Sequence, residues 1–170
     1  VSEDTPINPS TQRGQRRKAA EQAWRAIPNL PLHIFRLAGI YGPGRGPFAK
    51  LRAGTARRII KPGQIFSRIH VDDIAQVLAA SMDRPNPAAI YNVCDDMPAP
   101  PQDVISYAAS LLGMPPPPEV PFEQAEMSLM ARSFYAESKR IRNDRIKSEL
   151  GIKLLYKDYK SVLTAILESE

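Results

Sequence analysis

The sequence has very few of the residues that build disulfide scaffolds, and no long apolar run. It contains one cysteine, one tryptophan and two histidines. No apolar stretch approaches the roughly 20 residues that span a membrane, and no internal repeat is present. Cys94 alone cannot form an internal disulfide, which suits the reducing cytoplasm as the expected location. The polar start Val1–Asp4 is no signal peptide, and its lack of Met favours a fragment or a processed product.

The charge is distributed unevenly along the 170 residues. Residues 1–70 hold 13 Lys and Arg against 3 Asp and Glu, a net charge of +10, whereas residues 71–170 hold 10 against 15, a net charge of −5. This asymmetry favours an anionic ligand or partner for the first part. Nucleic acid, a dinucleotide and a phosphorylated small molecule are all candidates, and a solvated basic surface is the alternative.

The pattern of apolar residues, caps and turn residues predicts an α/β order of elements. Strands are expected at 30–37 and 89–93, and a hairpin is expected from 57–60 and 65–70 around the turn 61–64. Helices are expected at 11–27, 48–53, 71–82, 101–112, around 122–134, at 143–150 and at 158–167, with a glycine-rich turn at 38–46 and an extended linker at 115–118. Because so few strands cannot complete a doubly wound sheet, the remaining strands are expected to come from elsewhere.

Four segments in a fixed order carry a resemblance to a known family. These are Phe35–Gly44 (Phe-Arg-Leu-Ala-Gly-Ile-Tyr-Gly-Pro-Gly), Arg68–Ala75 (Arg-Ile-His-Val-Asp-Asp-Ile-Ala), Ile90–Val93 (Ile-Tyr-Asn-Val), and Arg145–Gly151 followed by Tyr156 and a helix. Together they cover nearly the whole chain. The chain thus resembles the extended short-chain dehydrogenase/reductases, also called the NAD-dependent epimerase/dehydratase family, and is most similar to small bacterial members of unassigned substrate.

The resemblance implies an α/β fold, with a partial Rossmann-type parallel sheet plus the small C-terminal substrate-binding region of the family. Residues 1–170 would form the C-terminal portion, with 1–37 and 71–112 on the Rossmann side and 38–70 and 113–170 mainly on the substrate side. In the family, NAD or NADP binds to an N-terminal glycine-rich loop that this sequence lacks. Cofactor binding is therefore expected only together with an N-terminal half. The stretch Gly42–Gly46 follows the wrong strand for such a loop and is interpreted as a turn.

The resemblance also places a catalytic Tyr-x-x-x-Lys pair in the helix at 11–27. Here Arg13 and Arg17 occupy those two positions. Arg17 is a candidate to hold a ribose or a phosphate as a fixed cation. Arg13 cannot replace the tyrosine because a guanidinium is effectively never deprotonated, so the catalytic residues are unknown. A solvated basic helix face, which would include Arg16 and Lys18, is the alternative interpretation.

The glycine-containing turn after the first strand supplies the other candidate contacts. The resemblance implies that this turn lies against the nicotinamide, and the candidates are Leu37, Ala38, Gly39 and Ile40. The candidate substrate-binding residues are Tyr41, Arg45, Arg68 and His70. Sugar-nucleotide members often carry Asn at the position of Gly39 and Arg at the position of Phe66. These two departures argue against a standard nucleotide-sugar substrate.

The cluster His70-Val-Asp-Asp73 contains three potential metal ligands at a strand–helix junction. Since no second cluster accompanies it, a capping carboxylate beside a packed histidine is preferred, and no metal is expected. Cys94 has no histidine near it in the sequence and is interpreted as an inert thiol.

Three functions follow, and whether the chain is an enzyme stays open. The first is an NAD(P)-dependent oxidoreductase or epimerase-like protein with a small, anionic substrate. The second is a non-catalytic protein that senses a dinucleotide on the same scaffold. The third is a basic nucleic-acid module, which is less favoured because no aromatic residues interleave the charges.

No membrane partner is expected. In the family, the helix matching 11–27 helps to form a dimer; its apolar stripe with Trp24 permits this, although burial against its own sheet is the alternative.

Overall fold

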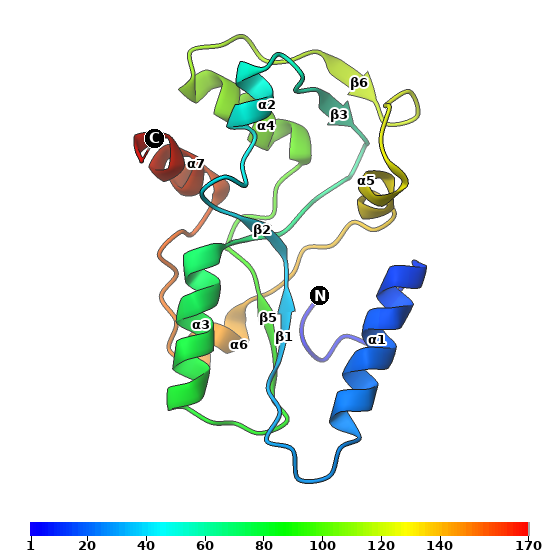
Figure 1. The fold of residues 1–170 in the computed structure, drawn as a ribbon, viewed down its shortest axis with the longest axis vertical. Coiled ribbons are helices and arrows are strands. Elements are labelled where there is room, and N and C mark those ends of the chain that lie inside the picture. Colours follow the sequence, from blue (N-terminus) through cyan, green and yellow to red (C-terminus); the bar gives the residue numbers. More distant parts are fainter. Residues whose placement is uncertain (170) are drawn as a thin grey trace.

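The computed structural model describes residues 1–169 and shows a mixed α/β arrangement. Figure 1 shows an elongated molecule with strands running through its middle and helices on either side. The helices are α1 (Gln12–Arg25), α2 (Phe48–Arg52), α3 (Val71–Asp83), α4 (Pro101–Leu111), α5 (Leu129–Phe134), α6 (Asp144–Ser148) and α7 (Tyr159–Glu168). The strands are β1 (Ile34–Leu37), β2 (Gly39–Tyr41), β3 (Arg58–Ile60), β4 (Arg68–His70), β5 (Ile90–Val93) and β6 (Glu119–Pro121).

The described strands form three parallel pairs, β1–β5, β2–β4 and β3–β6. The first pair runs from Ile34 opposite Ile90 to Leu37 opposite Val93. The expected hairpin over 57–70 is wrong, because β3 and β4 each pair with a strand from elsewhere in the chain. The strands β2 and β6 were not predicted, since β2 lies in the stretch interpreted as a glycine-rich turn and β6 directly follows the expected linker.

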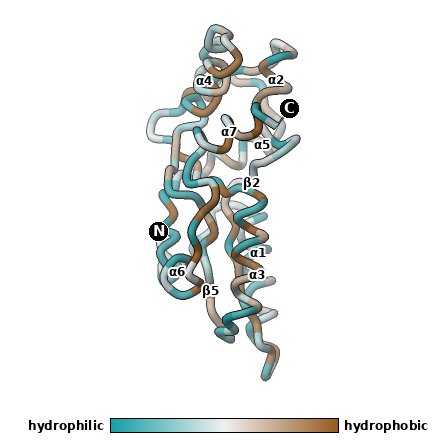
Figure 2. Tube along the Cα trace, turned by 90° about the vertical axis from the view of Figure 1, so that its left-hand side faces the viewer, coloured by the Kyte–Doolittle hydropathy of each residue, from teal (hydrophilic) through white to brown (hydrophobic). Residues whose placement is uncertain are grey.

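The first of two hydrophobic clusters surrounds the pair β1–β5 and the strand β4. Helix α3 packs against β4, and α6 packs against β5. Figure 2 shows hydrophobic stretches along these strands and along α3. The buried members are Ile69, Val77, Tyr91, Val93, Ile146, Leu150, Ile152 and Leu154.

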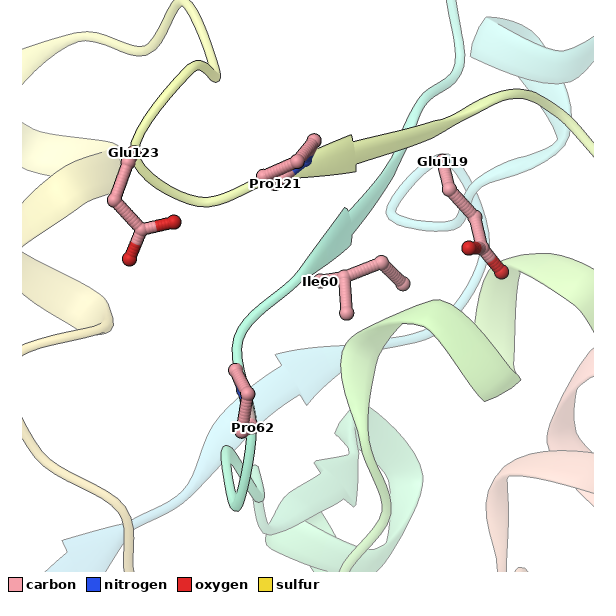
Figure 3. Close-up of a pocket in the computed structure, with 5 residues that line it drawn as sticks. All are labelled: Ile60, Pro62, Glu119, Pro121 and Glu123. Atoms are coloured by element: carbon pink, nitrogen blue, oxygen red, sulfur yellow. The ribbon is translucent and has the colours of Figure 1, made fainter.

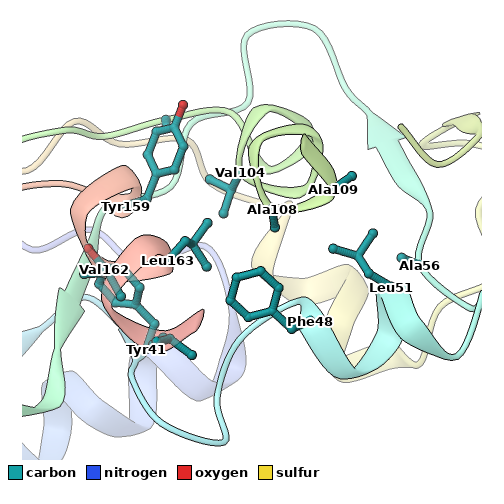
Figure 4. Packing of buried hydrophobic residues seen from close by; sticks show 12 residues of the cluster. Tyr41, Phe48, Leu51, Ala56, Val104, Ala108, Ala109, Tyr159, Val162 and Leu163 are labelled. Carbon is teal, nitrogen blue, oxygen red and sulfur yellow. The ribbon is translucent and has the colours of Figure 1, made fainter. Parts of the chain in front are cut away.

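The second cluster lies around α4 and is shown in Figure 4. Helix α4 contributes Val104 and Ala108, which are four residues apart and therefore share one face of the helix. Phe48 and Leu51 of α2 and four residues of α7 close the cluster around that face; the α7 residues are Tyr159, Val162, Leu163 and Ile166.

The two clusters group the elements differently from the expected Rossmann and substrate sides. Helix α4 lies within 71–112 and was assigned to the Rossmann side, but it packs with α2, α7 and β3. Residues 146–154 were assigned to the substrate side, but they pack with β4, β5 and α3. The reason is that packing follows the apolar faces of the helices rather than the order of segments along the chain.

Helix α1 differs from α3, α4 and α7 because each of its residues is exposed or partly exposed. Thr11 caps its start by accepting a hydrogen bond from the Gly14 N–H at 3.1 Å, as the sequence predicted. Trp24 is 57% exposed, so the apolar stripe is not buried against the strands that the structure describes. An ion pair between Glu21 and Arg36, 2.7 Å apart, connects the helix to β1. Figure 1 shows α1 standing beside the strands.

Candidate functional site

The candidate site lies at the carboxyl end of β1, where the chain turns into β2. Ala38 N–H donates to the Val93 carbonyl at 3.0 Å, and Gly39 N–H donates to the Ser67 carbonyl at 3.1 Å. These bonds fix the backbone of the turn, while the side chain of Leu37 remains 45% exposed. In parallel α/β sheets, ligands bind outside the carboxyl ends of the strands. The turn Leu37–Ile40 is therefore a rigid, exposed, apolar wall in the usual position for a ligand.

Tyr41, at the end of β2, is held by a buried carboxyl group. Its hydroxyl donates a hydrogen bond to Asp95 Oδ2 at 2.5 Å, and the Met97 N–H donates to Asp95 Oδ1 at 3.2 Å. Burial raises the pKa of Asp95 to about 6. Burial and the nearby charge of Asp95 also raise the pKa of Tyr41 above its ordinary value. The hydroxyl of Tyr41 is thus a committed donor and not an available base.

His70 lies opposite Tyr41 in the pair β2–β4 and is only 2% exposed. Its Nδ1 accepts the Asp72 N–H at 3.2 Å, so the histidine itself caps the start of α3. Its ring lies 4.0 Å from the ring of Tyr156, centroid to centroid. Among residues 1–169, no group of three or more His, Cys, Asp or Glu side chains is arranged to hold a metal ion.

The histidine and not a carboxylate is therefore the cap, and Asp73 in the first turn of α3 has a different role. Asp73 is fully buried and accepts hydrogen bonds from the Leu155 N–H at 2.7 Å and the Tyr156 N–H at 3.1 Å. It therefore connects α3 to the C-terminal segment rather than capping α3. Burial raises its pKa, and the two amide donors oppose that shift.

Arg68 and Arg45, the two basic substrate candidates, lie in different surroundings. Arg68 is opposite Gly39 in the pair β2–β4, and its Nη1 donates to the carbonyls of Phe66 and Ala99 at 3.0 and 3.3 Å. Burial lowers its pKa, while the charge of Asp95 opposes the shift. Arg45 is exposed in the turn that follows β2. The structure thus brings Tyr41, Arg68 and His70 together and leaves Arg45 apart.

The two arginines of α1 are both exposed. The guanidinium carbon of Arg13 lies 4.4 Å from the centroid of the Phe134 ring, at the end of α5. Arg17 lies one turn further along the same helix. The contact between Arg13 and Phe134 was not predicted, because the two residues are far apart in the sequence.

An aromatic cluster between α5 and β4 was also missed by the sequence analysis. The Tyr135 ring lies 5.3 Å from the Phe66 ring and 5.1 Å from the Phe122 ring, centroid to centroid. Lys61 and Arg132 lie 5.0 and 4.8 Å from the Phe122 centroid. The adjacent pair Phe134-Tyr135 was the only local sign of the cluster in the sequence.

Cys94 and a surface hollow at β3–β6 lie outside this arrangement. Cys94 is buried, its thiol donates to the Ile141 carbonyl at 3.4 Å, and burial raises its pKa to about 12. These properties agree with an inert thiol.

Figure 3 shows the hollow, which has a volume of about 320 Å³ and is lined by Ile60, Pro62, Glu119, Pro121 and Glu123.

The chain has the fold of the extended short-chain dehydrogenase/reductases, the NAD-dependent epimerase/dehydratase family. It superimposes with a TM-score of 0.82 on a human epimerase family protein, SDR39U1, in complex with NADPH, at 18% identity. It superimposes with a TM-score of 0.78 on dTDP-glucose 4,6-dehydratase from Bacillus anthracis in complex with NAD, at 16% identity. The whole chain matches 60% and 56% of these two proteins, which agrees with the expected C-terminal portion.

Particular relatives are more similar in sequence. The chain is 66% identical to a conserved protein of unknown function from Silicibacter pomeroyi, with a TM-score of 0.97, over 99% of this chain and 60% of that one. It is 32% identical over 160 residues to Protein YeeZ of Escherichia coli K12, and 28% identical over 140 residues to a 3-diazoavenalumate denitrifying reductase of a Streptomyces species. The chain spans 53% and 45% of these two curated relatives, about half their length. No model of a known protein family matches it.

Proposed function

We propose that the chain is part of an NAD(P)-dependent oxidoreductase or epimerase-like protein that acts on a small-molecule substrate. The observation that carries this proposal is the rigid turn Leu37–Ile40 at the carboxyl end of a parallel strand, with an apolar side chain left 45% exposed. Neighbours of the same fold are NAD or NADPH complexes, which supports a dinucleotide as the ligand.

The residues present fit one end of such a cofactor. The turn Leu37–Ile40 offers backbone and van der Waals contact to a nicotinamide ring, and Arg17 offers a fixed positive charge to a ribose or a phosphate. A bound nicotinamide dinucleotide supplies or accepts a hydride. The pyrophosphate of the cofactor needs a glycine-rich strand–helix unit, which this sequence does not contain. We therefore assign pyrophosphate binding to the additional residues of the longer relatives.

A second candidate function is a dinucleotide sensor without turnover. Arg13 supports this alternative, because it occupies the position of the family's tyrosine with a permanently charged group that is stacked on Phe134. Tyr41 is not a substitute, since its hydroxyl is committed to Asp95. Catalysis would therefore require a proton donor other than these two side chains.

Two exposed leucines allow a matched test in a version extended to the length of the Silicibacter pomeroyi relative. Leu37→Asp introduces a charge against the proposed nicotinamide position, whereas Leu155→Asp introduces the same charge at a remote site that is 62% exposed. We expect the first variant to weaken NADPH binding about tenfold or more and the second to leave binding unchanged, as measured by calorimetry.

The same protein separates the two functions. Oxidation of NADPH in the presence of a carbonyl substrate panel supports the oxidoreductase. Tight NADPH binding with no hydride transfer to any member of the panel supports the sensor. If the extended protein binds neither NADH nor NADPH, both functions are wrong.

A further inference from the structure

The aromatic cluster described above gathers rings from three separate segments, at Phe66, at Phe122 and at Phe134–Tyr135. Tyr135 is its buried centre, in contact with the half-buried rings of Phe66 and Phe122. The neighbouring residue Phe134 is 49% exposed and lies at the edge of the cluster. The cluster therefore has a buried ring, Tyr135, and a half-exposed ring, Phe134.

Positive charges surround these rings without neutralising carboxylates. Arg13 lies over Phe134, and Lys61 and Arg132 lie over Phe122. Lys61 and Arg132 each donate to a backbone carbonyl, those of Tyr135 and Ala125 respectively. Within residues 1–169, no carboxylate oxygen lies within 4.0 Å of these three cations or of Arg68. Arg13, Lys61 and Arg132 therefore place three positive charges at the aromatic cluster, while the charge of Asp95 partly compensates Arg68.

The cluster joins the two sides of the candidate site. It begins at Arg13 on α1, passes through Phe134 and Tyr135, and reaches Phe66 at the start of β4. The carbonyl of Phe66 accepts a hydrogen bond from Arg68, which lies opposite Gly39 in the nicotinamide turn. A ligand that reaches from α1 to this turn would meet these rings and guanidinium groups.

We infer that this surface recognises a planar aromatic anion, an aryl carboxylate, as the substrate of the proposed dinucleotide-dependent protein. This inference rests on the proposed function for its location and specifies the substrate class. The guanidinium of Arg13 lies over the Phe134 ring, and a guanidinium in this position can donate N–H groups to a carboxylate. The half-exposed ring of Phe134 then contacts the aromatic part of the ligand.

The same arrangement disfavours a nucleotide sugar. Phe66 fills its position with an apolar ring that packs on Tyr135, where sugar-nucleotide members often carry an arginine. A hydrated sugar hydroxyl gains little from an aromatic rim and loses hydrogen bonds to water on contact with it. The combination of cations and rings suits a ligand that is both charged and aromatic.

The test uses the extended protein with and without NADPH, and trans-cinnamate as the probe. Cyclohexanecarboxylate has the same charge without an aromatic ring, and cinnamyl alcohol has the ring without the charge. We expect saturation-transfer NMR to show contact with the cinnamate ring. We also expect its affinity to exceed that of each of the two comparison compounds by about tenfold.

Paired variants locate the site. Arg13→Gln should weaken cinnamate binding about tenfold, whereas Arg25→Gln, an exposed arginine at the other end of α1, should leave it unchanged. Phe134→Leu keeps an apolar side chain without a ring and should weaken binding about fivefold. Circular dichroism and retained NADPH binding confirm that these variants fold.

The outcomes separate the two proposals. NADPH binding with equal or absent binding of the three probes overturns the aromatic site and leaves the proposed function standing. Cinnamate binding without NADPH binding overturns the proposed function and supports the aromatic site. Equal losses in Arg13→Gln and Arg25→Gln overturn the site, because they indicate attraction to net charge alone. Competition of cinnamate by UDP-glucose at similar affinity also overturns it.

Discussion

The Tyr41 hydroxyl donates a hydrogen bond to Asp95 Oδ2 at 2.5 Å, and this bond connects the two packed regions of the molecule. Tyr41 belongs to the hydrophobic cluster around α4, whereas Asp95 lies two residues after the end of β5, which belongs to the other cluster. Asp95 is only 1% exposed. This buried polar contact therefore adds to the β2–β4 pairing in connecting the two regions.

The first prediction concerns stability as a function of pH. Burial raises the pKa of Asp95 from its ordinary value of 3.8 to about 6 in the folded protein. Between these values the folded protein retains a proton that the unfolded chain has lost, so the free energy of unfolding falls as the pH rises, by about 3 kcal/mol in total. We expect Asp95→Asn to reduce this decline in urea unfolding experiments.

The control for Asp95 is Asp83→Asn, a change at an exposed residue at the end of α3. In Asp83→Asn, the free energy of unfolding should change with pH as steeply as in the unmodified protein. Asp73 also has a raised pKa and contributes in the same direction, so some decline should remain in Asp95→Asn. If the free energy of unfolding depends on pH identically in Asp95→Asn and in the unmodified protein, Asp95 is not the group responsible for the decline.

The second prediction compares two adjacent aspartates. Asp73→Ala leaves the partly buried N–H groups of Leu155 and Tyr156 without their acceptor, so we expect a loss of about 2 kcal/mol in the free energy of unfolding. Asp72 is exposed in the first turn of α3, and Asp72→Ala should cost about 0.5 kcal/mol. Similar losses for the two variants in chemical denaturation would show that Asp73 does not hold the C-terminal segment.

The third prediction concerns the start of α1. Glu137 accepts hydrogen bonds from the N–H and hydroxyl of Ser10, at 3.0 and 2.8 Å, immediately before the cap of α1. Its contacts with Lys139 and Ser10 lower its pKa to about 2. This contribution to stability is complete above the ordinary value of 4.5 and is lost as the pH falls towards 2.

Glu137→Gln should therefore destabilise the protein by about 1 kcal/mol near neutral pH and by less in acid. Glu123→Gln, at an exposed position in the hollow of Figure 3, is the matched control and should have no effect. Hydrogen exchange of the α1 amides should accelerate in Glu137→Gln alone. Unchanged exchange in α1 would show that Glu137 does not anchor the helix.

The fourth prediction concerns self-association through α1, which we propose from its exposed apolar stripe. Trp24 is 57% exposed, and Ala23 and Ile27 line a small hollow beside it. Trp24→Ser should weaken a dimer in sedimentation equilibrium without destabilising the subunit. Met82→Ser removes an apolar side chain that is 74% exposed on α3 and should leave association unchanged. A monomer at all protein concentrations before mutation would contradict the proposal.

Most helices could be predicted because their signals are local. The apolar spacing of α3 and α4 was visible in the sequence. Of the two helical pieces expected around 122–134, the structure shows the short α5. None of the helices in residues 1–169 has the length and apolar character needed to cross a membrane.

The pairing of the strands could not be predicted in the same way. Residues 57–70 looked like a hairpin because a glycine–proline turn separates two apolar runs, but β3 pairs with β6, some 60 positions away. A parallel pair requires a long crossover, and the sequence close to a strand does not identify its partner. The candidate site shows the same limit, because the rings of Phe66, Phe122 and Tyr135 come together only in the folded chain.

The sequence by itself indicated the α/β class and the resemblance to the extended dehydrogenases, and it predicted that Arg13 and Arg17 occupy the tyrosine and lysine positions. These properties depend on residue identity and local spacing. Only the tertiary structure decided that α1 is left exposed, that Tyr41 is committed to Asp95 and that Arg13 stacks on Phe134. Those relationships join residues 54 and 121 positions apart, and long-range packing alone brings such residues into contact.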